Sequence, residues 1–187
     1  LDRFLRLFHD RICLGFTLLN PDVPPDFLLA YREKYDLQNI IRLGMAMPIL
    51  EGGNCHLPPT QYKDAAKWCL DLAGKAYQQS VKVGMDCGFV ACMFTPAEVG
   101  RLLHWGADLS FACSPAVDVG PDLEAWHCFS LSKLPRISLR KNDSLTILKQ
   151  TFTAQADELR RVHGPGIYAR CRTCKFMRRH QCSGGCL

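Results

Sequence analysis

The sequence lacks the signatures of several large protein classes. It has no long apolar run, so we expect neither a membrane-spanning helix nor a secretory signal peptide. Walker, GxGxxG and HExxH motifs do not occur, which argues against a P-loop, a Rossmann dinucleotide site and zinc-protease chemistry. No Ser, His and Asp constellation stands out, the six histidines form no spaced pair, and there are no repeats or low-complexity tracts.

What the sequence does contain is enough hydrophobic material for a folded domain. The chain has 187 residues, of which 48% are hydrophobic, and this length suits one domain or somewhat more. The first residue is Leu1, and residues 1–8 already have the pattern of an amphipathic helix. We therefore expect the chain to be a fragment of a longer protein.

Cysteine is the most unusual component, with eleven residues. A secreted disulfide scaffold is one explanation, but such domains are usually small and poor in core, and eleven is an odd number. Cys13 and Cys69 lie on apolar stretches and are expected to be core residues. For the eight cysteines that follow residue 85 we predict thiolate ligands in a reducing, cytoplasmic environment.

The last seventeen residues concentrate four thiols in a short basic segment. These are Cys171, Cys174, Cys182 and Cys186. The CxxC spacing lets a tight turn bring two sulfurs to one side, and Gly184 and Gly185 permit the left-handed backbone that turns the chain before Cys186. This spacing predicts a metal or cluster site rather than buried structural thiols.

Positive charge is concentrated in the same part of the chain. Residues 131–187 hold 12 Lys and Arg against 3 Asp and Glu, whereas residues 1–130 hold 11 against 15. The excess fits either a nucleic-acid footprint or the neutralisation of a negative thiolate centre. Cations near the thiols are Arg170, Arg172, Lys175, Arg178 and Arg179.

The first half of the chain predicts alternating strands and helices. We expect strands at 11–19, 40–47 and 80–85, and helices at 1–8, 26–35 and 60–79, the last with Thr60 as N-cap. This order predicts adjacent parallel strands with right-handed crossovers, as in part of a barrel or a doubly wound sheet. Polar residues Glu51, Asn54 and His56 follow the second strand, where a connecting loop is favoured over a ligand site.

The pattern changes after residue 86. We expect a helix at 96–104, a hairpin of strands 116–120 and 124–131, and a last helix that begins at Asp143 or Ser144. Eight cysteines follow residue 85, which is enough for two four-thiolate centres. Thiolates select zinc or iron–sulfur clusters, and their spacing alone does not decide between the two.

The order of these cysteines is specific. Cys113, a short hairpin, Cys128 and then the four terminal thiols, with Gly-Gly before the last, resemble the SPASM domain of radical S-adenosylmethionine enzymes. The preceding strand and helix units resemble the last three of six in that family's partial (βα)6 barrel. The resemblance implies an α/β fold, with residues 1–86 as the second half of a radical SAM barrel and residues 87–187 as a small cysteine-rich α+β SPASM or twitch-like domain.

The resemblance also implies a ligand assignment to auxiliary [4Fe-4S] clusters. Following the family pattern, Cys113, Cys128 and Cys186 would belong to the first cluster. The second would be bound by Cys171, Cys174 and Cys182. Cys87 and Cys92 are candidates for the remaining ligand of the first cluster, with buried strand-end thiols as the alternative.

Several features depart from the family pattern. Leu123 stands where a hairpin glycine is expected, the gap between Cys174 and Cys182 is longer than usual, and the downstream cysteine that completes the second cluster is not among these residues. The CxxxCxxC loop, whose cluster cleaves S-adenosylmethionine in this family, is also absent. The chain alone is therefore expected to be unable to start radical chemistry, and S-adenosylmethionine would bind only in the intact protein.

The resemblance implies an oxidoreductase or maturase that oxidises or crosslinks a peptide or protein side chain. This chain would be its cluster-binding part, and the missing N-terminal half of the same protein would be its partner. The alternative is a zinc-binding interaction module whose basic face binds nucleic acid. Because only Tyr168 and Phe176 lie near the terminal thiols to stack on bases, we expect nucleic acid not to be a partner.

Overall fold

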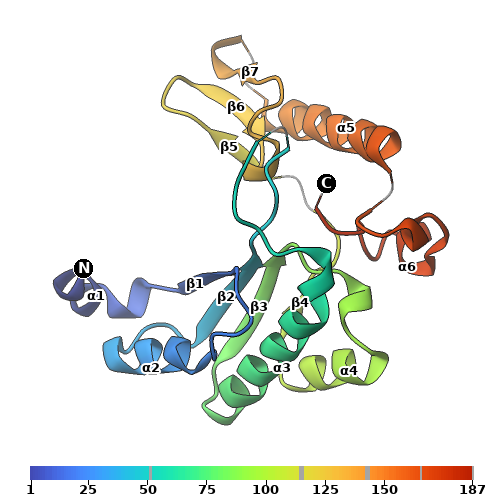
Figure 1. The fold of residues 1–187 in the computed structure, drawn as a ribbon. Coiled ribbons are helices and arrows are strands. Elements are labelled where there is room, and N and C mark those ends of the chain that lie inside the picture. The colour runs from blue at the N-terminus through green and yellow to red at the C-terminus, as the bar shows by residue number, and fades with distance from the viewer. Residues whose placement is uncertain (51, 114–115, 142–143, 165, 187) are drawn as a thin grey trace. The chain divides into compact units, whose positions relative to one another are not determined.

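The chain folds into two compact units in the computed structural model, which describes residues 1–50, 52–113, 116–141, 144–164 and 166–186 (Figure 1). Unit 1 comprises Leu1–Ala46 and Leu57–Ser110, and unit 2 comprises Met47–His56 and Phe111–Leu187. The domain boundary expected at residue 86 thus differs from the end of unit 1 at Ser110. Unit 1 extends further because a short strand adds to its sheet after residue 86.

Unit 1 is a mixed α/β unit built on a parallel sheet. Its strands are β1 (Leu14–Leu18), β2 (Ile40–Met45), β3 (Lys82–Cys87) and β4 (Asp108–Leu109), and its helices are α1 (Asp2–Leu7), α2 (Asp26–Tyr35), α3 (Tyr62–Gln78) and α4 (Pro96–His104). The strands pair in parallel in the order β1-β2-β3-β4. The three expected strands are therefore confirmed as parallel neighbours, and β4 was not predicted.

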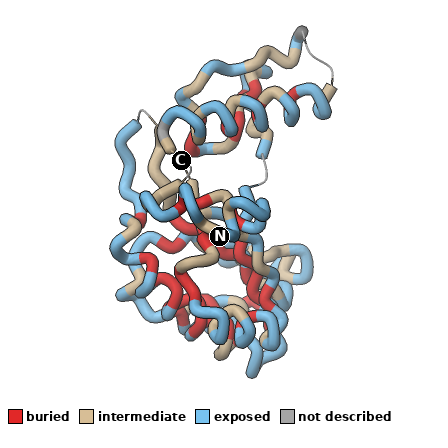
Figure 2. The backbone as a smooth tube through the Cα atoms, turned by 90° about the vertical axis from the view of Figure 1, so that its right-hand side faces the viewer, coloured by how far each residue is buried: buried red, intermediate tan, exposed pale blue. Residues whose placement is uncertain are grey.

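One face of this sheet is apolar and lies against helices. Ile41, Leu43 and Met45 of β2 are buried, and Phe16 of β1 stacks on Trp68 of α3 with ring centroids 5.6 Å apart. Helices α2, α3 and α4 lie together on one side of the sheet (Figure 1), as expected for a sequential strand order with right-handed crossovers. Figure 2 shows the buried residues of unit 1 gathered in its interior, with exposed residues around them.

Helix α3 confirms the expected apolar stripe. The four stripe residues are all buried, at 0% exposure each, and they are Ala65, Cys69, Leu72 and Ala76. The expectation that Thr60 caps this helix is wrong. Pro59–Gln61 form a 3-10 turn, α3 begins at Tyr62, and Gln61 takes the N-cap position without a side-chain bond. A proline two residues before the N-cap favours this tight entry into the helix.

Unit 2 contains a small antiparallel sheet and two helices. Its elements are β5 (Val117–Val119), β6 (Glu124–His127), β7 (Ile137–Ser138), α5 (Leu145–His163) and α6 (Lys175–Arg178). The β5 and β6 hairpin is confirmed, whereas β7 was not predicted. Ala125 of β6 and Leu148 and Phe152 of α5 form the buried core of this sheet. Ser144 caps α5 by accepting from the N–H of Ile147, and Asp143 lies outside the described residues.

The loop at residues 47–56 belongs to unit 2. Its Leu50 N–H donates to the carbonyl of Ser130 at 2.8 Å. The Asn54 side chain closes the loop, because its oxygen accepts from Ile49 N–H and its nitrogen donates to Met47 O, each at 2.9 Å. This supports a connecting loop, and Glu51 lies outside the described residues. Among the described helices, none has both the length and the apolar composition to cross a membrane.

Candidate functional site

All eleven cysteines are free thiols in the structure, and they are divided between the units. Six of the eight predicted ligands are in unit 2. The other two are in unit 1, where Cys87 ends β3 and is exposed, and Cys92 lies in the 3-10 helix Ala91–Met93 and is half-buried. Their assignment as a ligand of the first cluster therefore stays a prediction.

Cys128 lies where β6 ends and a 3-10 helix over Phe129–Leu131 begins. Its φ of 42° is left-handed, a conformation that a residue with a Cβ rarely adopts. Burial raises the pKa of the Cys128 thiol to about 11, while hydrogen bonds from the backbone N–H groups of Leu131 and Ser130 act to lower it. Such N–H groups stabilise a thiolate and are typical of sulfur ligands in metal centres.

Two further thiols lie near Cys128. In their ionised forms Cys186 and Cys113 act on the Cys128 pKa in the same direction as burial, with smaller effects. Charge repulsion fades beyond about 10 Å in salt solution, so each of the two lies within reach of Cys128. The three thiols come from the hairpin, the segment before it and the chain end, and together they form what we call the first thiol group.

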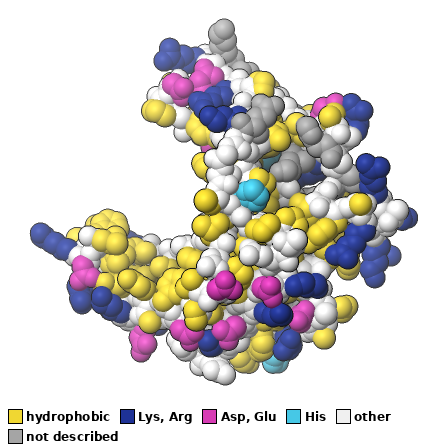
Figure 3. Space-filling view, viewed as in Figure 1, with side chains coloured by type: hydrophobic (Ala, Val, Ile, Leu, Met, Phe, Trp, Pro, Cys, Tyr) yellow, Lys and Arg dark blue, Asp and Glu magenta, His cyan; other side chains and the backbone are white. Residues whose placement is uncertain are grey.

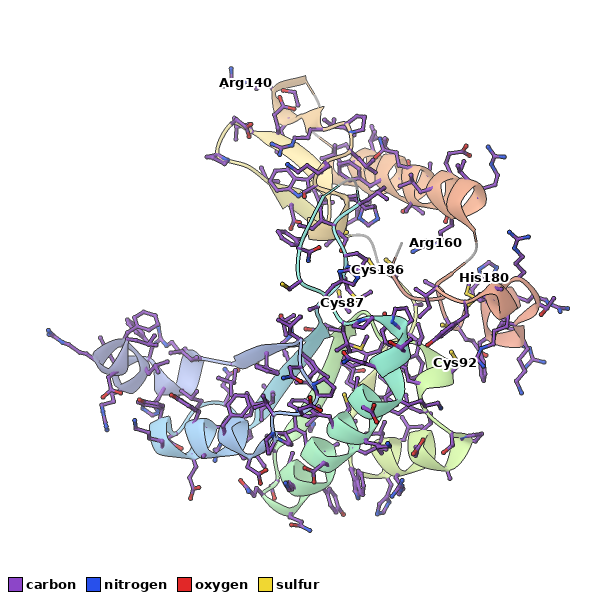
Figure 4. All side chains as sticks on the ribbon, viewed as in Figure 1. Cys87, Cys92, Arg140, Arg160, His180 and Cys186 are labelled. Carbon is purple, nitrogen blue, oxygen red and sulfur yellow. The ribbon has the colours of Figure 1, made fainter. Side chains whose placement is uncertain are left out.

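A short pair of hydrogen bonds holds the chain end beside the segment that precedes the hairpin. The N–H of Cys113 donates to Ser183 Oγ at 2.6 Å, and the N–H of Ser183 donates to the carbonyl of Phe111 at 2.9 Å. The residues joined by the first bond are 70 positions apart in the sequence. This contact brings the Cys186 segment (Figure 4) to Cys113.

A second thiol group is formed by Cys171 and Cys182, both 7% exposed. The sulfur of Cys182 accepts from the N–H of Gly184 at 3.3 Å. On the other side, a Cβ added to Gly166 would lie 2.9 Å from both Cys171 Sγ and Gly184 Cα. The two buried sulfurs therefore both lie close to Gly184, and Gly166 is required because no side chain fits there.

The CxxC turn and the Gly-Gly pair have the expected backbone. The N–H of Cys174 donates to the carbonyl of Cys171 at 3.1 Å, which closes the turn, and Cys174 then caps α6 and is half-buried. Gly184 and Gly185 have φ values of 76° and 97°. The left-handed backbone predicted before Cys186 is thus confirmed.

The chemistry of these groups is that of soft sulfur donors with backbone N–H groups beside them. Across the described residues, no three Cys, His, Asp or Glu side chains have the arrangement that holds a single metal ion. Thiolates bind both zinc and iron–sulfur clusters, so the donor type alone does not select between them.

The second face of the unit 1 sheet is polar and rich in glycine. By the strand register it includes Gly15, Thr17, Ile40, Arg42, Gly44, Lys82 and Gly84, and Asp86 joins it through its ion pair with Arg42. A Cβ added to any of its three glycines would meet no heavy atom within 4 Å. Arg42 pairs with Asp86 at 2.9 Å, and this pairing raises the pKa of the Arg42 guanidinium. This face is therefore exposed at Gly15, Thr17 and Arg42, whereas Gly84 is buried.

Sequence reasoning missed the residues that support the thiols. Gly166 and Ser183 each contact a segment that is distant in the sequence, so no local pattern shows their role. Ser183 stands between two of the terminal cysteines, which could have drawn attention to it. Nothing in the sequence shows that its hydroxyl accepts a hydrogen bond from Cys113. The backbone N–H donors beside Cys128 and Cys182 have no sequence signal at all.

Comparison with known proteins found no relative of this chain. No family model matches it, and no match was found among curated proteins or solved structures. Support for a function therefore comes from the cysteine pattern and from the contacts around the thiols.

Proposed function

We propose that this chain is the cluster-binding part of a radical S-adenosylmethionine oxidoreductase or maturase that acts on a peptide or protein. In this proposal unit 1 is the second half of a partial (βα)6 barrel, and unit 2 is a SPASM-like domain with auxiliary [4Fe-4S] clusters. The observation that supports it is that thiols distant in the sequence lie together in two groups. Cys113 and Cys186 lie within reach of Cys128, and Cys171 and Cys182 lie close to Gly184.

This division agrees with the ligand sets that the family resemblance implies. The first thiol group would hold one auxiliary cluster, and Cys171, Cys174 and Cys182 would hold the other. A bound cluster supplies one-electron transfer, with a potential set by burial, hydrogen bonds and nearby charge. The chain provides N–H donors to two of the sulfurs and keeps Cys171 and Cys182 away from water.

The sheet of unit 1 supports the barrel part of the proposal. Parallel sheets are normally covered on both faces, yet α2, α3 and α4 lie on one face only. The outer edge of β1 has no strand partner among the described residues, since β1 pairs with β2 alone. Closure by strands of an N-terminal half would enclose the polar face that carries Arg42 and Asp86. That half would also supply the CxxxCxxC loop and the site for S-adenosylmethionine.

Metal analysis of the anaerobically purified chain tests this function. We expect a brown protein with about eight irons and about eight acid-labile sulfides per chain, as two four-iron clusters require. A colourless protein that contains zinc and no acid-labile sulfide would overturn the proposal and favour the zinc-binding interaction module. Iron without sulfide would also contradict it, because a cluster contains both.

A further inference from the structure

The end of unit 2 carries a concentrated positive surface. Its cations lie on the 3-10 helix Ala169–Thr173 and on α6 and the residue after it, and all are exposed. This cationic surface consists of Arg170, Arg172, Lys175, Arg178 and Arg179. Figure 3 shows Lys and Arg side chains gathered at the place of α6. Residues 164–187 contain no Asp or Glu, so this segment accounts for the whole net charge of +5.

These cations lack acidic partners within the described part of the chain. Several cations elsewhere are paired, as Lys75 is with Asp26 and Asp71, and Arg161 with Glu158. None of the five takes part in an ion pair between described residues. An uncompensated surface of one sign attracts a partner of the opposite sign and orients its approach.

The aromatic side chains of this surface are covered by its own cations. The Arg170 guanidinium lies 4.8 Å from the centre of the Tyr168 ring, and the Lys175 ammonium lies 5.3 Å from that of Phe176. Single-stranded nucleic acids bind by stacking their bases on free aromatic faces, and a cation covers one face of each of these two rings. Helix α6, with four residues, is also too short for an amphipathic membrane-surface helix. Carboxylates are the anions that this surface suits best.

We propose that the cationic surface binds an acidic segment of the peptide or protein substrate. The inference rests on the proposed function, because it names the feature by which the substrate of that enzyme is held. Arginine binds a carboxylate better than lysine does, since its planar guanidinium group donates two parallel hydrogen bonds to the two carboxylate oxygens. Four of the five cations are arginines. A run of glutamates or aspartates therefore fits the surface in sign and in geometry.

Fluorescence anisotropy with the cluster-loaded chain tests this inference. The probes are a labelled ten-residue peptide of alternating Glu and Ser, the same peptide with Gln in place of Glu, and a labelled ten-nucleotide thymidine strand. We compare wild type with the double variant Arg172→Gln/Arg179→Gln, since neither side chain has a hydrogen bond among the described contacts. The matched control is Arg140→Gln/Lys149→Gln, two exposed cations of unit 2, and Figure 4 shows Arg140 well apart from His180 beside α6.

We expect the Glu peptide to bind at low salt and the Gln peptide to bind at least tenfold more weakly. The Arg172/Arg179 variant should weaken binding of the Glu peptide by about tenfold, because two exposed charge pairs are lost. Added salt should weaken it further by screening, while the control variant stays within about twofold of wild type.

Three results would overturn the inference. Equal affinity for the Glu and Gln peptides would exclude recognition of carboxylates, and tighter binding of the thymidine strand would assign the surface to nucleic acid. Loss of iron from the Arg172/Arg179 variant would show that these cations serve the cluster instead. An iron-loaded chain that binds no Glu peptide refutes this inference alone, whereas a chain that binds no iron refutes the proposed function.

Discussion

The replacement Gly166→Ala tests the packing around the second thiol group. A Cβ at this position would lie 2.9 Å from Cys171 Sγ, from Gly184 Cα and from Gly184 O. Two of these three atoms belong to the backbone, so a change of rotamer cannot relieve the clash. The N–H of Ile167 donates to the same Gly184 carbonyl at 2.9 Å, which fixes the two segments against each other. The chain must therefore move at Gly184, and with it the N–H that Cys182 accepts from.

Overpacking of this kind lowers the free energy of unfolding by about 1–3 kcal/mol. Because the clashing atoms here include backbone atoms, we expect a loss near the upper end of this range. In a domain of roughly 60–100 residues, 1 kcal/mol lowers the melting temperature by about 4–8 °C, so we expect a fall of about 10–20 °C. We also expect about four fewer irons per chain, since Cys171 and Cys182 would no longer hold a cluster. Thermal unfolding followed by circular dichroism, together with iron analysis, measures both effects.

The matched control is Gly53→Ala, also in unit 2. A Cβ at Gly53 meets no heavy atom within 4 Å, so the melting temperature should stay close to that of wild type. If Gly166→Ala unfolds at the wild-type temperature and keeps all its iron, the packing of Cys171 and Cys182 about Gly184 is incorrect.

Three further predictions concern backbone strain, burial and the support of the first thiol group. Leu123→Gly should be about 1 kcal/mol more stable to urea than Leu123→Ala, because the φ of 63° at this position is unfavourable for any residue with a Cβ, and the opposite order would refute this. Iodoacetamide at mildly alkaline pH should label exposed Cys55 and spare Cys69, whose pKa burial raises to about 12, and labelled Cys69 in a mass spectrum of the native protein would contradict its place in the core. Ser183→Ala removes the acceptor of the Cys113 N–H, so it should lower the free energy of unfolding by about 0.5–1.5 kcal/mol. It should also lower the iron content per chain. Ser183→Thr keeps the hydroxyl, so equal iron in both variants would argue against a supporting role.

Much of unit 1 could be predicted because its signals are local. A continuous apolar run predicted β1 and β2, and helical spacing predicted α3 and its buried stripe. The two-residue strands β4 and β7 escaped prediction because a strand of that length has no periodicity. Strand β1 was expected to be buried, yet as the edge of the sheet it keeps Gly15 and Thr17 exposed.

The candidate site was predictable in its residue types but not in its contacts. CxxC spacing and the Gly-Gly pair predicted the turn at Cys174 and the left-handed backbone before Cys186, and both are present. The contact of Ser183 with Cys113 depends on tertiary structure, which no spacing rule encodes. At Leu123 the resemblance predicted a glycine, and the left-handed φ of 63° is a conformation that glycine adopts more readily than leucine.

The central claim is that the terminal segment serves two centres, and electron paramagnetic resonance of the reduced Cys186→Ser variant tests it most directly. Cys186 lies within reach of Cys128, and Cys171 and Cys182 lie close to Gly184. The control is Cys55→Ser, which changes an exposed thiol of the same unit outside both groups and should keep both cluster signals. We predict that Cys186→Ser loses iron and the signal of the first cluster while the signal of the second remains. Loss of both signals, or of neither, would contradict the division of the terminal thiols between two clusters.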